Sequence, residues 1–143
     1  MAKKPTHTLR IRVRAGDTDY TGLAFNARIV EWFSAGRIEL LRSRRITYLN
    51  DARLAAEGKP QKVSFVVGEI YARFLASVRF DELVELKVSI AEVRDKTVKF
   101  NYVVKSIPDK RLLATGNSTS VCVDLGTMRS TTLPSKIATL LNA

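Results

Sequence analysis

The feature that most constrains the fold of this chain is one long amphipathic helix followed by a series of long strand-like segments. Between residues 27 and 44, apolar side chains recur at the i, i+3, i+4 and i+7 spacing of a helix with one buried face. The segments that follow are alternating or rich in β-branched and aromatic residues, at 63–74, 84–90, 98–104 and 112–124. A helix followed by such a run of strands predicts an α+β domain, with a long antiparallel sheet curved around the helix.

Three further elements complete the expected order. A strand over 9–15 alternates apolar residues with arginines, and a turn-rich stretch over 16–25 joins it to the long helix. A shorter helix is expected over 47–57, because a glycine and a proline follow closely and would end it. A last short helix is expected after Pro134.

The length of the chain indicates how these elements are organised. Its 143 residues have the size of one ordinary domain, and no repeat or linker divides them. We therefore expect a single domain over 1–143, with residues 1–8 as a flexible arm. No apolar run approaches the roughly 20 residues of a membrane helix, and the N-terminus lacks the apolar core of a signal peptide. A cytoplasmic protein without membrane contact is expected.

The scarcity of histidine and cysteine limits the possible chemistry. The one histidine, His7, lies in the expected arm, so Ser-His-Asp and Cys-His catalysis lack an imidazole held by the fold. The one cysteine, Cys122, rules out an intramolecular disulfide and lies in an apolar run, where a buried strand residue is expected. We expect no metal site, and any catalysis would depend on carboxylates, backbone dipoles and cations.

The net charge of +10 indicates an anionic partner. Nucleic acid, an acidic carrier protein, a membrane surface or a ligand with several phosphates would all fit. Arginines at 10, 12 and 14 and at 42, 44 and 45 motivate the nucleic-acid alternative. They are equally consistent with a solvated strand face and with cations at the C-terminal end of a helix. The chain shows no zinc finger and no aromatic-basic RNA-binding signature, so nucleic-acid binding is a secondary hypothesis.

The stretch most suited to chemistry is the turn before the long helix. It carries Asp17 and Asp19, and Asn26 stands seven residues after Asp19 as the expected N-cap. The first N–H groups of a helix are unpaired and carry a partial positive charge, which can hold an oxyanion. A carboxylate facing them can attack a carbonyl or activate a water. The alternative is that these residues only shape a turn and cap a helix.

The same stretch carries a family resemblance. Asp17-Thr-Asp-Tyr-Thr-Gly22, Phe25-Asn-Ala-Arg28, Glu31-Trp-Phe and Arg37 resemble the 4-hydroxybenzoyl-CoA thioesterase-like family of hot-dog fold acyl-CoA thioesterases. The similarity continues through Ala72–Leu75, Val78–Leu83, Leu113–Gly116, Val121–Asp124 and Leu133-Pro134. It covers nearly the whole chain in the expected order.

The resemblance implies a hot-dog fold and hydrolysis of an acyl-coenzyme A. Asp19 matches the catalytic carboxylate, and Asn26 matches the helix-start position whose N–H faces the thioester carbonyl, although many relatives have histidine there. Arg94 and Lys96 match basic positions that contact the coenzyme A phosphates, and with neighbouring Thr97 they are expected to bind substrate, with a solvated hairpin turn as the alternative.

The resemblance also implies an active site shared by two protomers, hence a homodimer or homotetramer, and no cofactor beyond the coenzyme A of the substrate. Other hypotheses stay open: an acyl carrier protein as the substrate carrier, or a non-catalytic module that binds acyl-CoA or nucleic acid. A hot-dog dehydratase is disfavoured, since its chemistry requires a histidine held by the fold and His7 is badly placed for that.

Overall fold

The computed structural model describes residues 4–143 and contains the predicted long helix and long strands. In chain order its elements are β1 (Thr6–Arg12), η1 (Ala15–Asp17), α1 (Asn26–Ser43), β2 (Ile46–Tyr48), β3 (Leu54–Ala56), β4 (Lys59–Pro60), β5 (Val63–Phe74), β6 (Leu83–Val93), β7 (Thr97–Ser106), β8 (Leu112–Asp124) and α2 (Ser135–Asn142). The expected α+β class and the order of the long elements are confirmed.

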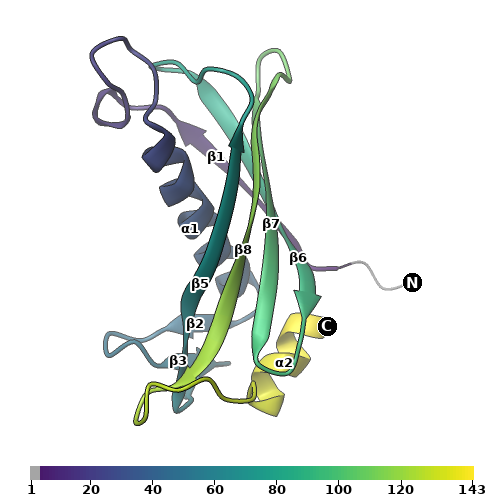
Figure 1. Cartoon of the computed structure of the whole chain (residues 1–143). Helices are drawn as coiled ribbons and strands as arrows, with labels where there is room; N and C mark the ends of the chain where they lie inside the picture. The colour runs from purple at the N-terminus through teal and green to yellow at the C-terminus, as the bar shows by residue number, and fades with distance from the viewer. Residues whose placement is uncertain (1–3) are drawn as a thin grey trace.

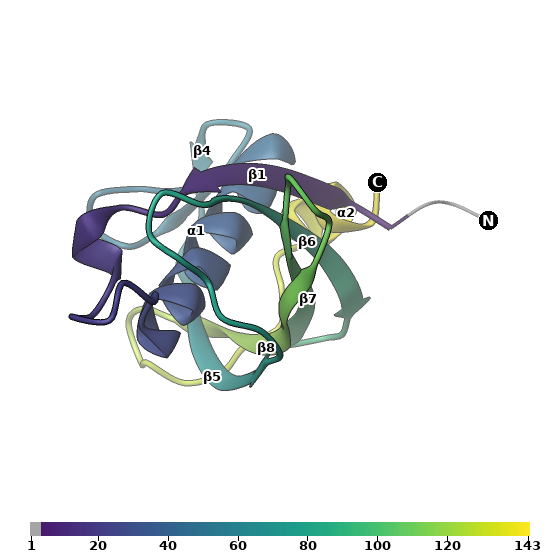
Figure 2. The same cartoon turned by 90° about the horizontal axis from the view of Figure 1, so that it is seen from above.

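The main sheet has five antiparallel strands in the order β1-β6-β7-β8-β5. It curves around α1, which lies against its concave face, while α2 covers the end of the sheet near the hairpin between β6 and β7 (Figures 1 and 2). This arrangement is the hot-dog fold. The short strands β2, β3 and β4 form a separate small sheet beside the C-terminal part of α1.

The core lies between α1 and the concave face of the sheet. The ring of Phe33 on α1 stacks on Tyr102 of β7 with centroids 4.4 Å apart, and both side chains are fully buried. Phe33 also passes close over Gly116 of β8, where an added Cβ would lie 2.5 Å from its ring. The helix can therefore approach the sheet closely because β8 has no side chain at this position.

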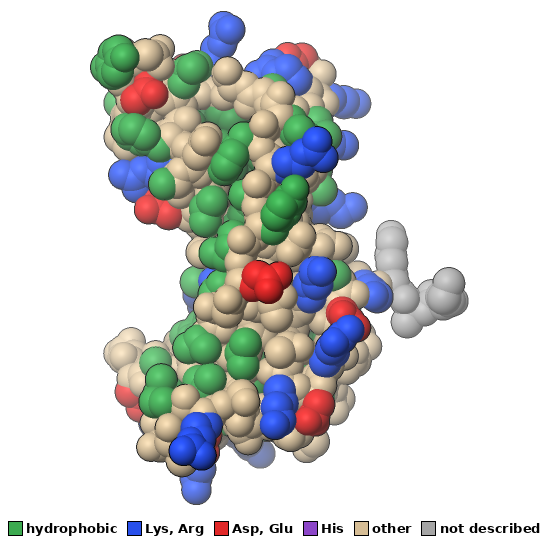
Figure 3. Space-filling view, in the orientation of Figure 1, with side chains coloured by type: hydrophobic (Ala, Val, Ile, Leu, Met, Phe, Trp, Pro, Cys, Tyr) green, Lys and Arg blue, Asp and Glu red, His purple; other side chains and the backbone are tan. Residues whose placement is uncertain are grey.

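Strand β5 forms one edge of the sheet, and from Val66 onward it is unusually apolar for an exposed edge. It pairs with β8 on one side and with no other strand among residues 4–143. Its exposed large hydrophobic residues are Val66, Val67, Ile70, Tyr71 and Phe74. Hydrophobic side chains accordingly gather along this part of the surface (Figure 3). A long apolar edge strand favours pairing with another chain.

Two local predictions were wrong. Residues 47–57 do not form a helix, because Leu54, Ala55 and Ala56 are buried as strand β3 and the backbone turns at Ala52 with φ 74°. Burial in the small sheet here overrides the helix preference of alanine. The expectation of a flexible arm over 1–8 does not hold for residues 6–8, since β1 begins at Thr6 and pairs with β6; residues 1–3 lie outside the described residues.

His7 therefore belongs to β1, where it pairs with Val88 of β6.

Neither α1 nor α2 is both long and apolar enough to cross a membrane, which holds for every helix within residues 4–143.

Candidate active site

The loop between β1 and α1 holds Asp19 in a tight turn. The Asp19 N–H donates to the carbonyl of Leu23 at 2.9 Å, and the Gly22 N–H donates back to the carbonyl of Asp19 at 3.1 Å. Gly22 has φ 80°, in the left-handed region that side chains disfavour, so glycine is the suitable residue there. The turn thereby fixes the backbone on both sides of the carboxylate.

The carboxylate of Asp19 is held by Thr21. Its Oδ1 accepts a hydrogen bond from the Thr21 hydroxyl at 2.5 Å and another from the Thr21 N–H at 2.8 Å. These bonds, the hydroxyl bond first, lower the pKa of Asp19 below its ordinary value, because both stabilise the ionised form. Among the described residues no donor binds Oδ2. Asp19 is thus an anion at neutral pH with one oxygen free for chemistry.

Asp17, two residues earlier, has a different role. Its Oδ2 accepts the Arg14 N–H at 2.9 Å, its Oδ1 lies 3.9 Å from Nε of Arg28, and its side chain is only 18% exposed. Its carbonyl also accepts the Phe25 N–H at 3.0 Å. Asp17 thus fastens the turn to the start of α1. Of the two carboxylates, Asp19 is the one that the fold leaves available.

Helix α1 begins at Asn26 with uncapped amides. Phe25 occupies the N-cap position, so the prediction that the Asn26 side chain caps the helix was wrong. The Phe25 carbonyl accepts the N–H groups of Arg28 and Ile29 at 3.0 and 3.4 Å. Within residues 4–143, the N–H groups of Asn26 and Ala27 donate to no acceptor. Such free amides at a helix start attract negative charge.

A cleft of about 330 Å³ opens beside this helix start. Its walls come from the start of α1, from the turn before it, and from the end of β5 with the loop that follows: Leu23, Ala24, Asn26, Ile29 and residues 74–78. Asn26 faces the cleft. Asp19 does not line it, but adjoins it through Leu23, whose carbonyl binds the Asp19 N–H. Most residues that line the cleft are apolar, although polar atoms make up much of its exposed surface, and a helix N-terminus lies at one end. This combination can take an acyl group whose carbonyl reaches the amides.

The expected coenzyme A contacts lie elsewhere. Arg94, Lys96 and Thr97 belong to the hairpin between β6 and β7, at the opposite end of the sheet from the Asp19 turn (Figure 1). Arg94 is exposed and pairs with Glu92 at 2.8 Å. A single protomer therefore does not bring these residues to Asp19.

Two features of the site were missed by the sequence reasoning. One is Thr21 as partner of Asp19, although a side-chain oxygen that binds a backbone N–H two residues later is a recurrent turn pattern and was a usable signal. The other is the cleft wall at residues 74–78, which comes from a distant part of the sequence. No local pattern indicates that this segment lies beside α1.

The remaining reactive and charged groups have structural surroundings. Cys122 is buried, and burial raises the pKa of its thiol to about 11, so a nucleophilic thiolate is disfavoured. The described residues contain no cluster of three or more histidine, cysteine, aspartate or glutamate side chains that could hold a metal. In the basic cluster, Arg42 pairs with Glu39, Arg45 lies 3.9 Å from Glu57, and Arg44 donates to the carbonyl of Leu140.

Known proteins share this fold and sequence pattern. The chain is 27% identical over 127 residues to the acyl-CoA thioesterase YbgC of Haemophilus influenzae, covering 89% of this chain and 88% of the relative. The structure of the hypothetical protein TT1821 from Thermus thermophilus is 29% identical, with a TM-score of 0.80 over 94% of this chain and 95% of that one.

A 1,4-dihydroxy-2-naphthoyl-CoA thioesterase from Synechocystis has the same fold, with a TM-score of 0.81 at 16% identity over 95% of both chains. The thioesterase-like superfamily matches residues 13–141, which is nearly the whole chain. This chain is a member of the thioesterase-like superfamily.

Proposed function

We propose that this protein hydrolyses the thioester bond of an acyl-coenzyme A to a free acid and coenzyme A. Asp19 is the reacting carboxylate, and the amides of Asn26 and Ala27 hold the oxyanion. The observation that carries the proposal is a carboxylate ionised at neutral pH, with one free oxygen, in a turn that leads directly to an uncapped helix start. The superfamily and the relative named as an acyl-CoA thioesterase support hydrolysis of an acyl-CoA thioester, and the roles of the individual residues are our proposal.

The reaction has two balanced routes. In the first, Asp19 takes a proton from water while the water oxygen attacks the thioester carbonyl carbon. The carbon–sulfur bond then breaks, and the coenzyme A thiolate receives the proton from Asp19. In the second, Asp19 itself attacks and expels the thiolate, which forms a mixed anhydride that water hydrolyses. In both routes the carbonyl oxygen becomes negative and the helix N-terminus stabilises it.

Single-turnover hydrolysis in ¹⁸O-labelled water tests for the second route. If Asp19 attacks the carbonyl and water then opens the anhydride at the Asp19 carboxyl carbon, the label enters Asp19 and is found by mass spectrometry of its peptide. If the label appears only in the acid product, water attacked the acyl carbon, as the first route requires and as an anhydride opened at that carbon also would.

We propose a homodimer as the smallest active unit. The exposed apolar edge β5 pairs well with a second copy of itself, since antiparallel edge pairing satisfies both backbones and covers Ile70 and Phe74. Such pairing reverses the partner's strand direction. The partner's β6–β7 hairpin, which lies at the end of the sheet where β5 starts, then comes to the end where this protomer holds Asp19. Arg94 and Lys96 of the partner subunit would thereby serve the substrate bound at this Asp19.

Mixed dimers test this shared site. Asp19→Ala and the double variant Arg94→Ala/Lys96→Ala each impair both sites of their own homodimer. A heterodimer of the two has one intact site and regains activity if the residues act across the interface. If verified heterodimers show no gain, the proposed sharing is wrong. Assembly of two dimers into a tetramer is a further part of the proposal, and light scattering measures it.

A finer placement in the 4-hydroxybenzoyl-CoA thioesterase-like family, and a cytoplasmic location, also belong to the proposal. The acyl group is best found with a panel of aromatic, short branched and long fatty acyl-CoAs, with released thiol as the readout. Release from none of them by the dimeric protein would contradict the proposed activity.

An acyl carrier protein is the second candidate carrier, because such proteins are acidic and this chain carries +10. The ratio of kcat/KM for one acyl group on the two carriers decides between them. The nucleic-acid alternative has less support, since Arg42, Arg44 and Arg45 already have partners within the fold. Anisotropy of a labelled duplex at low salt tests it, because phosphate-driven binding is strongest there.

A further inference from the structure

The loop between β5 and β6, residues 75–82, supports the Asp19 turn from outside. The Ala24 N–H donates to the carbonyl of Val78 at 2.7 Å, and the Phe80 N–H donates to the carbonyl of Gly22 at 2.9 Å. Leu23, which binds the Asp19 N–H, lies between these two contacts and forms a bridge with Arg79. The same loop supplies part of the cleft wall. Its position therefore affects both the carboxylate and the acyl cleft.

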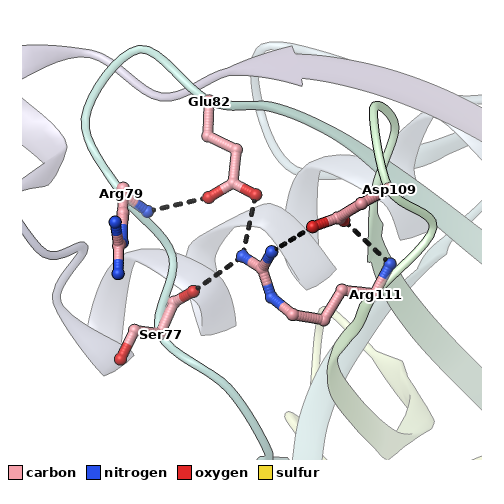
Figure 4. A network of polar contacts seen from close by, with 5 residues as sticks. All are labelled: Ser77, Arg79, Glu82, Asp109 and Arg111. Carbon is pink, nitrogen blue, oxygen red and sulfur yellow. Dashed lines mark hydrogen bonds and ion pairs between the residues drawn. The ribbon is translucent and has the colours of Figure 1, made fainter.

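The side chain of Arg111, from the connection between β7 and β8, holds this loop in place (Figure 4). Arg111 lies just before β8 and donates to the carbonyl of Ser77 at 3.3 Å and to Oε2 of Glu82 at 3.0 Å. It also binds Oδ2 of Asp109 at 2.5 Å. The other oxygen of Glu82 accepts the Arg79 N–H at 3.0 Å. Arg111 thus connects both ends of the irregular stretch to the turn between β7 and β8.

The contacts of Arg111 with Ser77, Glu82 and Asp109 together form a clamp on the loop, and this clamp is more than a surface ion pair. The Glu82 side chain is only 12% exposed, whereas exposed pairs contribute little. The loop has no regular strand pairing over these residues, and Asp81 has φ 67°, a strained conformation for a non-glycine residue. Arg111 donates to three acceptors that lie apart in the chain, on Ser77, Glu82 and Asp109. A planar guanidinium can donate to all three together, whereas a lysine ammonium lacks this forked arrangement of N–H groups.

We infer that Arg111 is a positioning residue for Asp19. It acts through Ser77 and Glu82 on the 75–82 loop, and the loop holds the turn that fixes the carboxylate relative to the free amides of α1. The inference rests on the proposed function where catalysis is concerned, because only then does the position of Asp19 govern a rate. Small displacements of a reacting group cost large factors in rate.

The chain offers a matched control. Arg53 binds Asp51 two residues before it, at 2.7 Å, and its N–H binds the same carboxylate, as Arg111 does with Asp109. Arg53 lies in the turn between β2 and β3, away from the 75–82 loop. Arg53→Ala therefore removes an ion pair of the same kind but leaves the contacts of the 75–82 loop intact.

The test compares Arg111→Ala, Arg53→Ala and the isosteric Glu82→Gln by kcat, KM and amide exchange. We expect Arg111→Ala to lower kcat about tenfold to a hundredfold, with a smaller change in KM, and ethylguanidinium to restore part of the loss. Arg111→Lys should not restore it. Glu82→Gln, which keeps the shape of the side chain, should lower kcat in the same direction, and Arg53→Ala should leave kcat unchanged.

Amide exchange judges the clamp without any substrate. The Ala24 and Phe80 amides should exchange faster in Arg111→Ala and Glu82→Gln, while the amides of β7 stay protected. Unchanged exchange at both positions would overturn the clamp itself. Faster exchange with unchanged kcat would overturn the positioning role. An inactive wild type with faster exchange in the variants would instead contradict the proposed function and leave the clamp established.

Discussion

Replacing Gly116 by alanine tests the close approach of α1 to the sheet. A Cβ at this position would lie 2.5 Å from Cε2 of Phe33 and 2.5 Å from the carbonyl oxygen of Tyr71. Neither neighbour can move easily, since the Phe33 ring is stacked on the buried Tyr102 and the carbonyl belongs to the backbone of β5. Overpacking a core usually costs about 1–3 kcal/mol, and two rigid contacts place this case near the upper end.

We therefore expect Gly116→Ala to lower the free energy of unfolding by about 2–3 kcal/mol. For a chain of this size that corresponds to about 6–12 °C in melting temperature. Urea and thermal unfolding at equal protein concentration measure the change, because dimerisation would make the stability depend on concentration.

Two other glycines serve as controls. Gly16 has nothing within 4 Å of an added Cβ, so Gly16→Ala should be neutral or slightly stabilising. At Gly36 the nearest atom, at 2.6 Å, is the flexible end of Leu86, and alanine also favours the helix by about 1 kcal/mol. Gly36→Ala should thus cost clearly less than Gly116→Ala. If all three variants unfold within about 0.5 kcal/mol of each other, a range ordinary for surface changes, the described packing is wrong.

Three further predictions concern the pH response and the dimer. Thr21→Val removes the hydroxyl that lowers the pKa of Asp19, so this pKa should rise and the acid limb of the pH–rate profile should move to higher pH. Thr21→Ser retains a hydroxyl and should leave the acid limb in place. An acid limb that does not move in Thr21→Val would argue against Asp19 as the titrating group. Burial raises the pKa of Cys122 from 9.0 to about 11, so its protonated form stabilises the fold fully below pH 9, and that contribution is lost between about pH 9 and 11 as the unfolded thiol ionises. Ellman's reagent should leave native Cys122 unmodified at pH 8 and react after unfolding, and rapid native reaction would contradict its burial. Ile70→Lys places a charge on the exposed edge β5 and should shift the protein toward monomer in light scattering, whereas an unchanged mass would place the interface elsewhere.

Much of the fold could be predicted because its signals are local and repetitive. The apolar face of α1, the alternation in β6 and β7, and the β-branched and aromatic residues of β5 each extend over many residues, and they identify these elements well. The region 47–57 could not be predicted in this way, because Leu54, Ala55 and Ala56 suit a helix equally and only their burial in a small sheet decides. The start of β1 was missed because Thr6, His7 and Thr8 show no alternation of apolar residues. They belong to the strand because their backbone pairs with β6, which no local pattern indicates.

The candidate site was only partly readable for a related reason. Asp19 and the helix start lie within one short stretch, and that stretch carries the family resemblance. The Asn26 side chain was expected to cap the helix, but the helix begins one residue earlier, so Asn26 contributes its backbone. The loop 75–82 and Arg111 lie far away in the sequence, and only the folded sheet brings them to the turn. Whether Arg94, Lys96 and Thr97 bind coenzyme A stays a prediction.

The most direct test of the central claim compares two aspartates in similar turns. Asp19 and Asp51 each accept a backbone N–H from the residue two positions later, and local hydrogen bonds lower the pKa of both carboxyl groups. With the best acyl-CoA of the panel, Asp19→Asn should lower kcat by about 10²–10⁴-fold, the usual contribution of an acid–base group, while Asp51→Asn retains the wild-type rate of thiol release. Equal rates for wild type and Asp19→Asn, with both proteins folded and dimeric, would contradict the assignment of Asp19.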